Sequence, residues 1–98
     1  MTTELLAIHL FSDKVGQAFV IEDADAAGVE LTLSEVSALR NFADAARAPF
    51  SLLFTGKGPG VLPQRMYTLR HPELGLQSIF LVPIAGSAEK VTYQAVFN

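Results

Sequence analysis

The sequence contains no cysteine among its 98 residues. Disulfide bridges, thiolate metal sites and thiol catalysis are therefore excluded together, and the hydrophobic core alone must hold the fold. Long hydrophobic runs are lacking as well, since the longest, Ile79–Ala85, is far shorter than the roughly 18–20 residues that span a bilayer. No basic residue precedes Lys14, and no small-residue cleavage site follows the first apolar stretch, so we expect no signal peptide. We accordingly expect a cytoplasmic protein with no membrane partner.

Charge is also scarce. Charged residues make up 17% of the chain, against about 25% in an average soluble domain. The net charge of −3 provides no basic stripe for a phosphate backbone, so we expect no nucleic-acid partner. The apolar share of 50% excludes intrinsic disorder, and the length fits a single domain over residues 1–98. With so few charges to cover its surface, the domain should keep some apolar surface exposed, which is typical of an interface.

Short apolar or alternating runs separated by Gly, Pro or Asp are typical of a mainly β domain. We predict a small antiparallel barrel or roll of about six strands. The strands are expected at Val15–Glu22, Val29–Ser34, Phe50–Thr55, Arg65–Arg70, Gln77–Ile84 and Lys90–Phe97.

Three local signals refine this prediction. The alternation slips at Glu35–Val36, which indicates a bulge or the end of a strand. Pro83 lacks an N–H group, so the far end of its strand should be an edge, a bulge or outside the ladder. The segment His71–Gly75 predicts a tight turn that joins its flanking strands as an antiparallel hairpin.

Two short helices are also expected. Glu4–Ser12 can form one or two helical turns with Leu5, Leu6, Ile8 and Phe11 as candidate buried positions. Apolar residues from Val36 to Ala46 follow a helical spacing, so we predict a short helix at about 36–47 that Pro49 would end. The alternative for this segment is a long loop with one helical turn.

The terminal strand Lys90–Phe97 leaves two interpretations open. It carries a single charge, Lys90, and is interrupted by no proline. At a sheet edge it would offer unpaired N–H and C=O groups to another chain. Alternatively, it closes the barrel internally.

No motif selects a catalytic or ligand-binding chemistry. Asp23-Ala24-Asp25 resembles the opening of a calcium loop, but the twelfth position is Ser34 where a glutamate is needed. Gly56-Lys57-Gly58 lacks the spacing of a phosphate-binding P-loop. His9 and His71 are far apart in the sequence and show no metal-ligand spacing. We therefore expect no catalytic residue, no metal site and no cofactor, and a protein that is not an enzyme. A hydrolase would require His9 or His71 beside a carboxylate in a cleft.

Several segments together resemble a small bacterial domain family of unknown function. They are Val15-Gly16-Gln17-Ala18-Phe19, Pro49–Gly56 (PFSLLFTG), Leu62-Pro63-Gln64, Tyr67–Gly75 (YTLRHPELG), Phe80–Ile84 (FLVPI) and Tyr93–Asn98 (YQAVFN). The resemblance implies a stand-alone domain of about this length. It also implies relatives encoded beside phage-tail-collar-like proteins, and hence an accessory or assembly role in a tail-like structure. It brings no catalytic residues with it.

The leading functional hypothesis is a non-enzymatic protein-interaction or assembly module whose partner is itself, as a homo-oligomer, or another protein. The candidate interaction residues lie on the terminal strand, on the strand before the predicted hairpin turn, and in that turn: Tyr93, Val96, Phe97, Tyr67, His71 and Glu73. The alternative is a small-ligand or carbohydrate-binding β-barrel that uses Tyr67, Tyr93 or the loops Gly56–Gln64 and His71–Gly75. That alternative requires a concave pocket lined by aromatic side chains.

Overall fold

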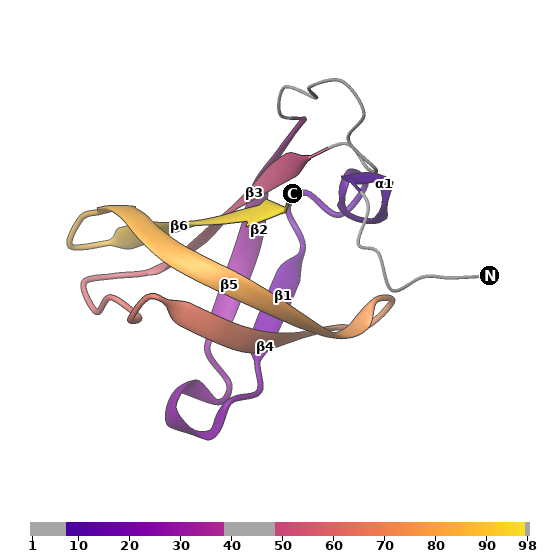
Figure 1. The fold of residues 1–98 in the computed structure, drawn as a ribbon. Coiled ribbons are helices and arrows are strands. Elements are labelled where there is room, and N and C mark those ends of the chain that lie inside the picture. Colours follow the sequence, from indigo (N-terminus) through magenta and orange to yellow (C-terminus); the bar gives the residue numbers. More distant parts are fainter. Residues whose placement is uncertain (1–7, 39–48, 98) are drawn as a thin grey trace.

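The computed structural model describes residues 8–38 and 49–97, and these form a closed barrel of antiparallel strands (Figure 1). The order around the barrel is β1-β2-β3-β6-β5-β4, which confirms the predicted mainly β architecture. The strands are β1 (Ala18–Ile21), β2 (Glu30–Ala38), β3 (Phe50–Lys57), β4 (Arg65–His71), β5 (Gly75–Gly86) and β6 (Lys90–Phe97), and the helical elements are α1 (Ile8–Phe11) and the 3-10 turn η1 (Ala24–Ala26).

The barrel is built from two three-stranded units. Strands β1, β2 and β3 follow one another, and the chain then crosses over so that β4 lies beside β1, which is a Greek-key arrangement. Strand β6 returns to lie between β3 and β5 and pairs with both. Of the two interpretations of the terminal strand, the internal one is therefore confirmed. The edge interpretation is wrong, because closure of the barrel gives β6 a partner on each side.

The predicted irregularities in the strands lie where the sequence places them. The β2–β3 register shifts between Leu33 and Glu35, and the β5–β6 register shifts between Pro83 and Ala85. Each shift is a bulge of the kind that Val36 and Pro83 predict. The β4–β5 hairpin turns at the predicted segment, where Gly75 has φ +72°, a conformation that favours glycine.

The helix predicted at about 36–47 is wrong for its first residues. Val36 pairs with Leu52 and Ala38 pairs with Phe50, so this segment continues β2. The physical reason is the bulge: the extra residue brings Val36 back into phase with the interior, where it packs against the core. The rest of that prediction, from residue 39 onward, lies outside the described residues.

Helix α1 confirms the helical turn expected near the N-terminus, and residues 4–7 of that prediction lie outside the described part. Its last residue, Phe11, is fully buried and closes one end of the barrel. The Phe11 ring lies 6.4 Å from that of Phe19 and 6.1 Å from those of Phe50 and Phe97, measured between ring centroids. Burial of these rings anchors α1 to the strands.

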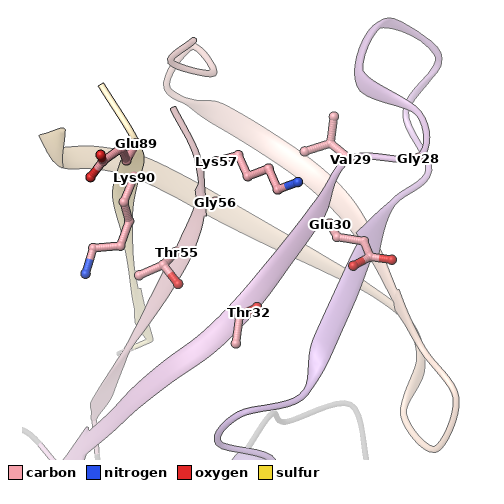
Figure 2. Close-up of a pocket in the computed structure, with 9 residues that line it drawn as sticks. All are labelled: Gly28, Val29, Glu30, Thr32, Thr55, Gly56, Lys57, Glu89 and Lys90. Atoms are coloured by element: carbon pink, nitrogen blue, oxygen red, sulfur yellow. The ribbon is translucent and has the colours of Figure 1, made fainter. Parts of the chain in front are cut away.

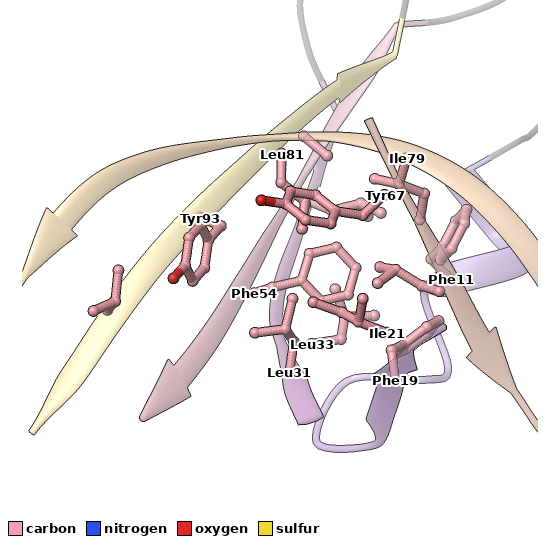
Figure 3. Close-up of a cluster of buried hydrophobic side chains, with 14 of the residues drawn as sticks. Phe11, Phe19, Ile21, Leu31, Leu33, Phe54, Tyr67, Ile79, Leu81 and Tyr93 are labelled. Carbon is pink, nitrogen blue, oxygen red and sulfur yellow. The ribbon is translucent and has the colours of Figure 1, made fainter. Parts of the chain in front are cut away.

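Side chains of alternating strand residues occupy the barrel interior (Figure 3). The period of two in the sequence is the cause, since every second residue of a strand points to the same face. The fully buried interior residues include Phe19, Ile21, Leu31, Leu33, Phe54, Tyr67, Leu69, Ile79, Leu81 and Tyr93. Within residues 8–38 and 49–97, none of the helices has the length and apolar character needed to traverse a bilayer.

Candidate interaction surface

An apolar patch lies on the outside of the barrel over β4, β5 and β6. Met66 pairs with Phe80 across β4 and β5, and both point outward because their neighbours Tyr67 and Ile79 are buried in the interior. Met66 is 53% exposed and Phe80 is 45% exposed. Large apolar side chains exposed side by side are typical of an interaction surface.

The patch continues along β5 and onto β6. Val82 follows Phe80 on the same face and pairs with Gln94 of β6, and Val96 lies two residues further along β6. Val82 is half-buried and Val96 is 49% exposed. We call this surface the outer apolar face and define it as Met66, Phe80, Val82 and Val96.

The outer apolar face is centred on β5, a strand without charge. None of the residues of β5, whose sequence is GLQSIFLVPIAG, is charged. The arginines of β4 form ion pairs on the side of β4 that faces β1, not on the side that faces β5. Arg65 pairs with Asp25, and Arg70 pairs with Glu22. The Asp23 carboxylate also accepts a hydrogen bond from the Thr68 N–H at 2.7 Å, which extends the β1–β4 ladder by one step.

The six candidate residues from the sequence fall into two groups. Val96 belongs to the outer apolar face, and Glu73 is exposed in the β4–β5 turn, where its carboxylate lies 3.3 Å from the Lys14 Nζ. Tyr93, Tyr67 and His71 are at most 3% exposed, and Phe97 is half-buried against Phe50 with ring centroids 4.7 Å apart. The structure thus does not gather them at one surface.

The hydroxyl groups of the two tyrosines form hydrogen bonds with the protein backbone. The Tyr93 hydroxyl accepts a hydrogen bond from the Leu62 N–H at 2.9 Å, and the Tyr67 hydroxyl donates one to the Pro63 carbonyl at 2.6 Å. Burial raises the pKa of Tyr67 above its ordinary value near 10. Both side chains therefore fasten the connection between β3 and β4.

His71 is also held by its neighbours. Its Nδ1 accepts hydrogen bonds from the N–H groups of Glu73 at 3.0 Å and Leu74 at 3.4 Å. Since Nδ1 is an acceptor, Nε2 carries the hydrogen and donates to the Gln17 side-chain oxygen at 2.6 Å. In the described part of the chain, no carboxylate binds either ring nitrogen, and no three His, Asp or Glu residues cluster as metal ligands.

Sequence reasoning missed three residues of the outer apolar face: Met66, Phe80 and Val82. Two features of the sequence could have found Phe80 and Val82: the run over β5 contains no charge, and its residues alternate between the interior and the exterior of the barrel. Once Ile79 and Leu81 are assigned to the interior, Phe80 and Val82 must point outward.

Comparison with family models places this barrel among known domains. The model described as "Domain of unknown function (DUF6916)" matches residues 6–97, which is nearly the whole chain. Comparisons with curated proteins and with solved structures give no match. The chain belongs to the DUF6916 family of domains of unknown function.

Proposed function

We propose that the domain is a non-enzymatic interaction module that self-associates through the outer apolar face. The observation that carries the proposal is the exposure of Met66, Phe80 and Val96 around a strand that has no charged residue. Burying such a face removes apolar surface from water at about 25 cal/mol per Å². Burying β5 also desolvates no charged side chain, and desolvation of an ion costs several kcal/mol.

A second copy of the chain is the partner that this face fits. Two copies with a net charge of −3 repel each other, so a stable contact between them must form where charge is lacking. An interface related by two-fold symmetry places the same patch on both copies, and β5 is self-complementary because it is apolar and uncharged. Repeated copies of such a module would suit an accessory role in a tail-like assembly, which the family resemblance implies.

The test is the mass of the protein in solution, measured by light scattering on a size-exclusion column over a concentration series. We expect a discrete oligomer that persists on dilution. Phe80→Glu introduces a charge at the centre of the outer apolar face and should convert the oligomer into a monomer. Its folding is checked by circular dichroism, since Phe80 points out of the barrel.

Val61→Glu is the matched control. Val61 is 55% exposed in the connection between β3 and β4, and it is not part of the outer apolar face. The same change of charge there should leave the mass unaltered. A wild-type protein that is monomeric at every concentration would refute self-association, and so would equal effects of the two substitutions.

A further inference from the structure

Strands β2 and β3 separate at one end of the barrel (Figure 2). Their pairing ends at Thr32 and Thr55, although β2 begins at Glu30 and β3 continues to Lys57. Continuation of the register would pair Leu31 with Gly56 and then Glu30 with Lys57, but neither pair is formed. A gap therefore opens between two strands that are joined along the rest of their length.

The backbone groups of Glu30 and Lys57 face this gap. The Val29 carbonyl accepts a hydrogen bond from β1 at 2.9 Å, and the Gly58 N–H donates one toward the β5–β6 turn at 2.9 Å. Both bonds point away from the gap. Because successive strand residues direct their backbone groups to opposite sides, the N–H groups of Glu30 and Lys57 are directed into it. The gap thus presents backbone donors that the β2–β3 ladder does not use.

A hollow of about 680 Å³ lies at this gap. Its polar side chains are Glu30, Thr32, Thr55, Lys57, Glu89 and Lys90. Gly28, Val29 and Gly56 complete its wall. This volume falls within the roughly 300–1,000 Å³ of small-molecule sites. It is large enough for an anionic group together with an organic scaffold.

The hollow contains two lysines with no carboxylate partner among the described residues. Lys14, Arg65 and Arg70 each form an ion pair with a carboxylate, whereas Lys57 and Lys90 form none. Lys57 and Lys90 are direct cross-strand partners on β3 and β6. Figure 2 shows Lys57 extending into the gap, whereas Lys90 points away from it.

Two carboxylates, those of Glu30 and Glu89, lie in the same hollow and would repel a bound anion. Neither Glu30 nor Glu89 approaches Lys57 or Lys90 closely enough to form an ion pair within 4.0 Å. The lysines therefore keep their donors for a ligand. The glutamates weaken anion binding through their charge, so removing one of them should tighten it.

We propose that this groove binds a small organic phosphate, with the phosphate at the Lys57 ammonium group and the backbone N–H groups of the gap, and with the scaffold beside Thr32 and Thr55. A phosphate accepts charge-assisted hydrogen bonds from the Lys57 ammonium group and from backbone N–H groups, and Lys90 adds positive charge beside the hollow. The threonine hydroxyls both donate and accept, which suits the hydroxyl groups of a polyol. This site is separate from the outer apolar face, so the inference does not depend on self-association.

The experiment is a titration of the ¹⁵N-labelled protein with glucose 6-phosphate, followed by amide chemical shifts. We expect saturable shifts at Thr32, Thr55, Lys57 and Lys90, and no such shifts with glucose. Lys57→Gln should weaken binding about tenfold, which corresponds to the loss of one charge-assisted hydrogen bond. Lys90→Gln should weaken it less, because the Lys90 ammonium group points away from the gap and contributes only its charge. A rise in ionic strength should weaken binding in the wild type.

Two substitutions make the test specific. Glu89→Gln should tighten binding, because it removes a negative charge from the hollow. Arg70→Gln removes one positive charge outside the hollow, where Arg70 pairs with Glu22, and should leave the affinity unchanged. Absence of saturable shifts with glucose 6-phosphate would overturn the proposal. Equal weakening by Arg70→Gln and Lys57→Gln would also overturn it, because binding would then follow net charge alone.

Discussion

Substitution of Tyr93 by phenylalanine tests how the connection between β3 and β4 is held. The change removes one hydroxyl and leaves the ring in place, so it creates almost no cavity. The Leu62 N–H, which donates to that hydroxyl at 2.9 Å, loses its acceptor in a half-buried position. An unsatisfied buried donor costs about 1–3 kcal/mol. We expect the free energy of unfolding to fall by about 1–2 kcal/mol.

The matched change is Tyr67→Phe. Its hydroxyl donates to the carbonyl of Pro63, an exposed residue to which water can donate in its place. The expected loss is therefore smaller, about 0.5–1 kcal/mol. Because the two hydroxyls hold adjacent residues of one connection, the double variant should lose less than the sum of the two single losses.

Urea unfolding followed by far-UV circular dichroism measures these differences. In a domain of this size, 1 kcal/mol corresponds to a shift of about 4–8 °C in the melting temperature, so thermal unfolding gives an independent measure. The reasoning is refuted if Tyr67→Phe is the more destabilising variant, or if both changes fall below about 0.3 kcal/mol.

Three further outcomes are expected. Gly58→Ala should cost about 1–3 kcal/mol in urea unfolding, because a Cβ there would lie 2.5 Å from the Ser87 carbonyl oxygen. A hydrogen bond from Lys14 holds the pKa of Asp13 below its ordinary value near 3.8, and Lys14→Met should raise it in a carbon-detected NMR titration. Since this pKa is lower in the folded protein, the ion pair stabilises the fold above about pH 3.8, and that contribution is lost as the pH falls through the depressed pKa of Asp13. Deletion of Tyr93–Asn98 should abolish the cooperative unfolding transition, because it leaves β3 and β5 without their shared partner.

The sequence predicts the inward residues of the barrel well, because a strand repeats every two residues. Phe19 and Ile21, or Tyr67 and Leu69, need no knowledge of the partner strand to be assigned to one face. The same reasoning predicts the bulges, since a slipped phase or a proline is visible locally. This reasoning fails at Val36. A bulge shifts the alternation of the strand by one residue there, and the resulting spacing of apolar residues also fits a helix.

Strand order and surface character depend on contacts between distant segments. The position of β6 between β3 and β5 has no local signal, so the weakly charged Lys90–Phe97 suited an edge as well as an interior strand. The exposure of Phe80 follows only after Ile79 and Leu81 are assigned to the interior, because a run that is apolar on both faces does not itself show which face is buried. The open end of the β2–β3 ladder was equally hidden, because two strands must be placed before a gap between them exists.

The position of β6 also has a consequence for how the chain reaches its native state. Strands β3 and β5 each keep an open edge until β6 is available, and β6 is the last strand of the barrel to be synthesised. Closure therefore depends on pairings between segments far apart in the chain, which slows folding. During synthesis those two edges are exposed to other nascent chains. A chain that closes its barrel more slowly would therefore lose more protein to aggregation, even if the finished barrel were equally stable.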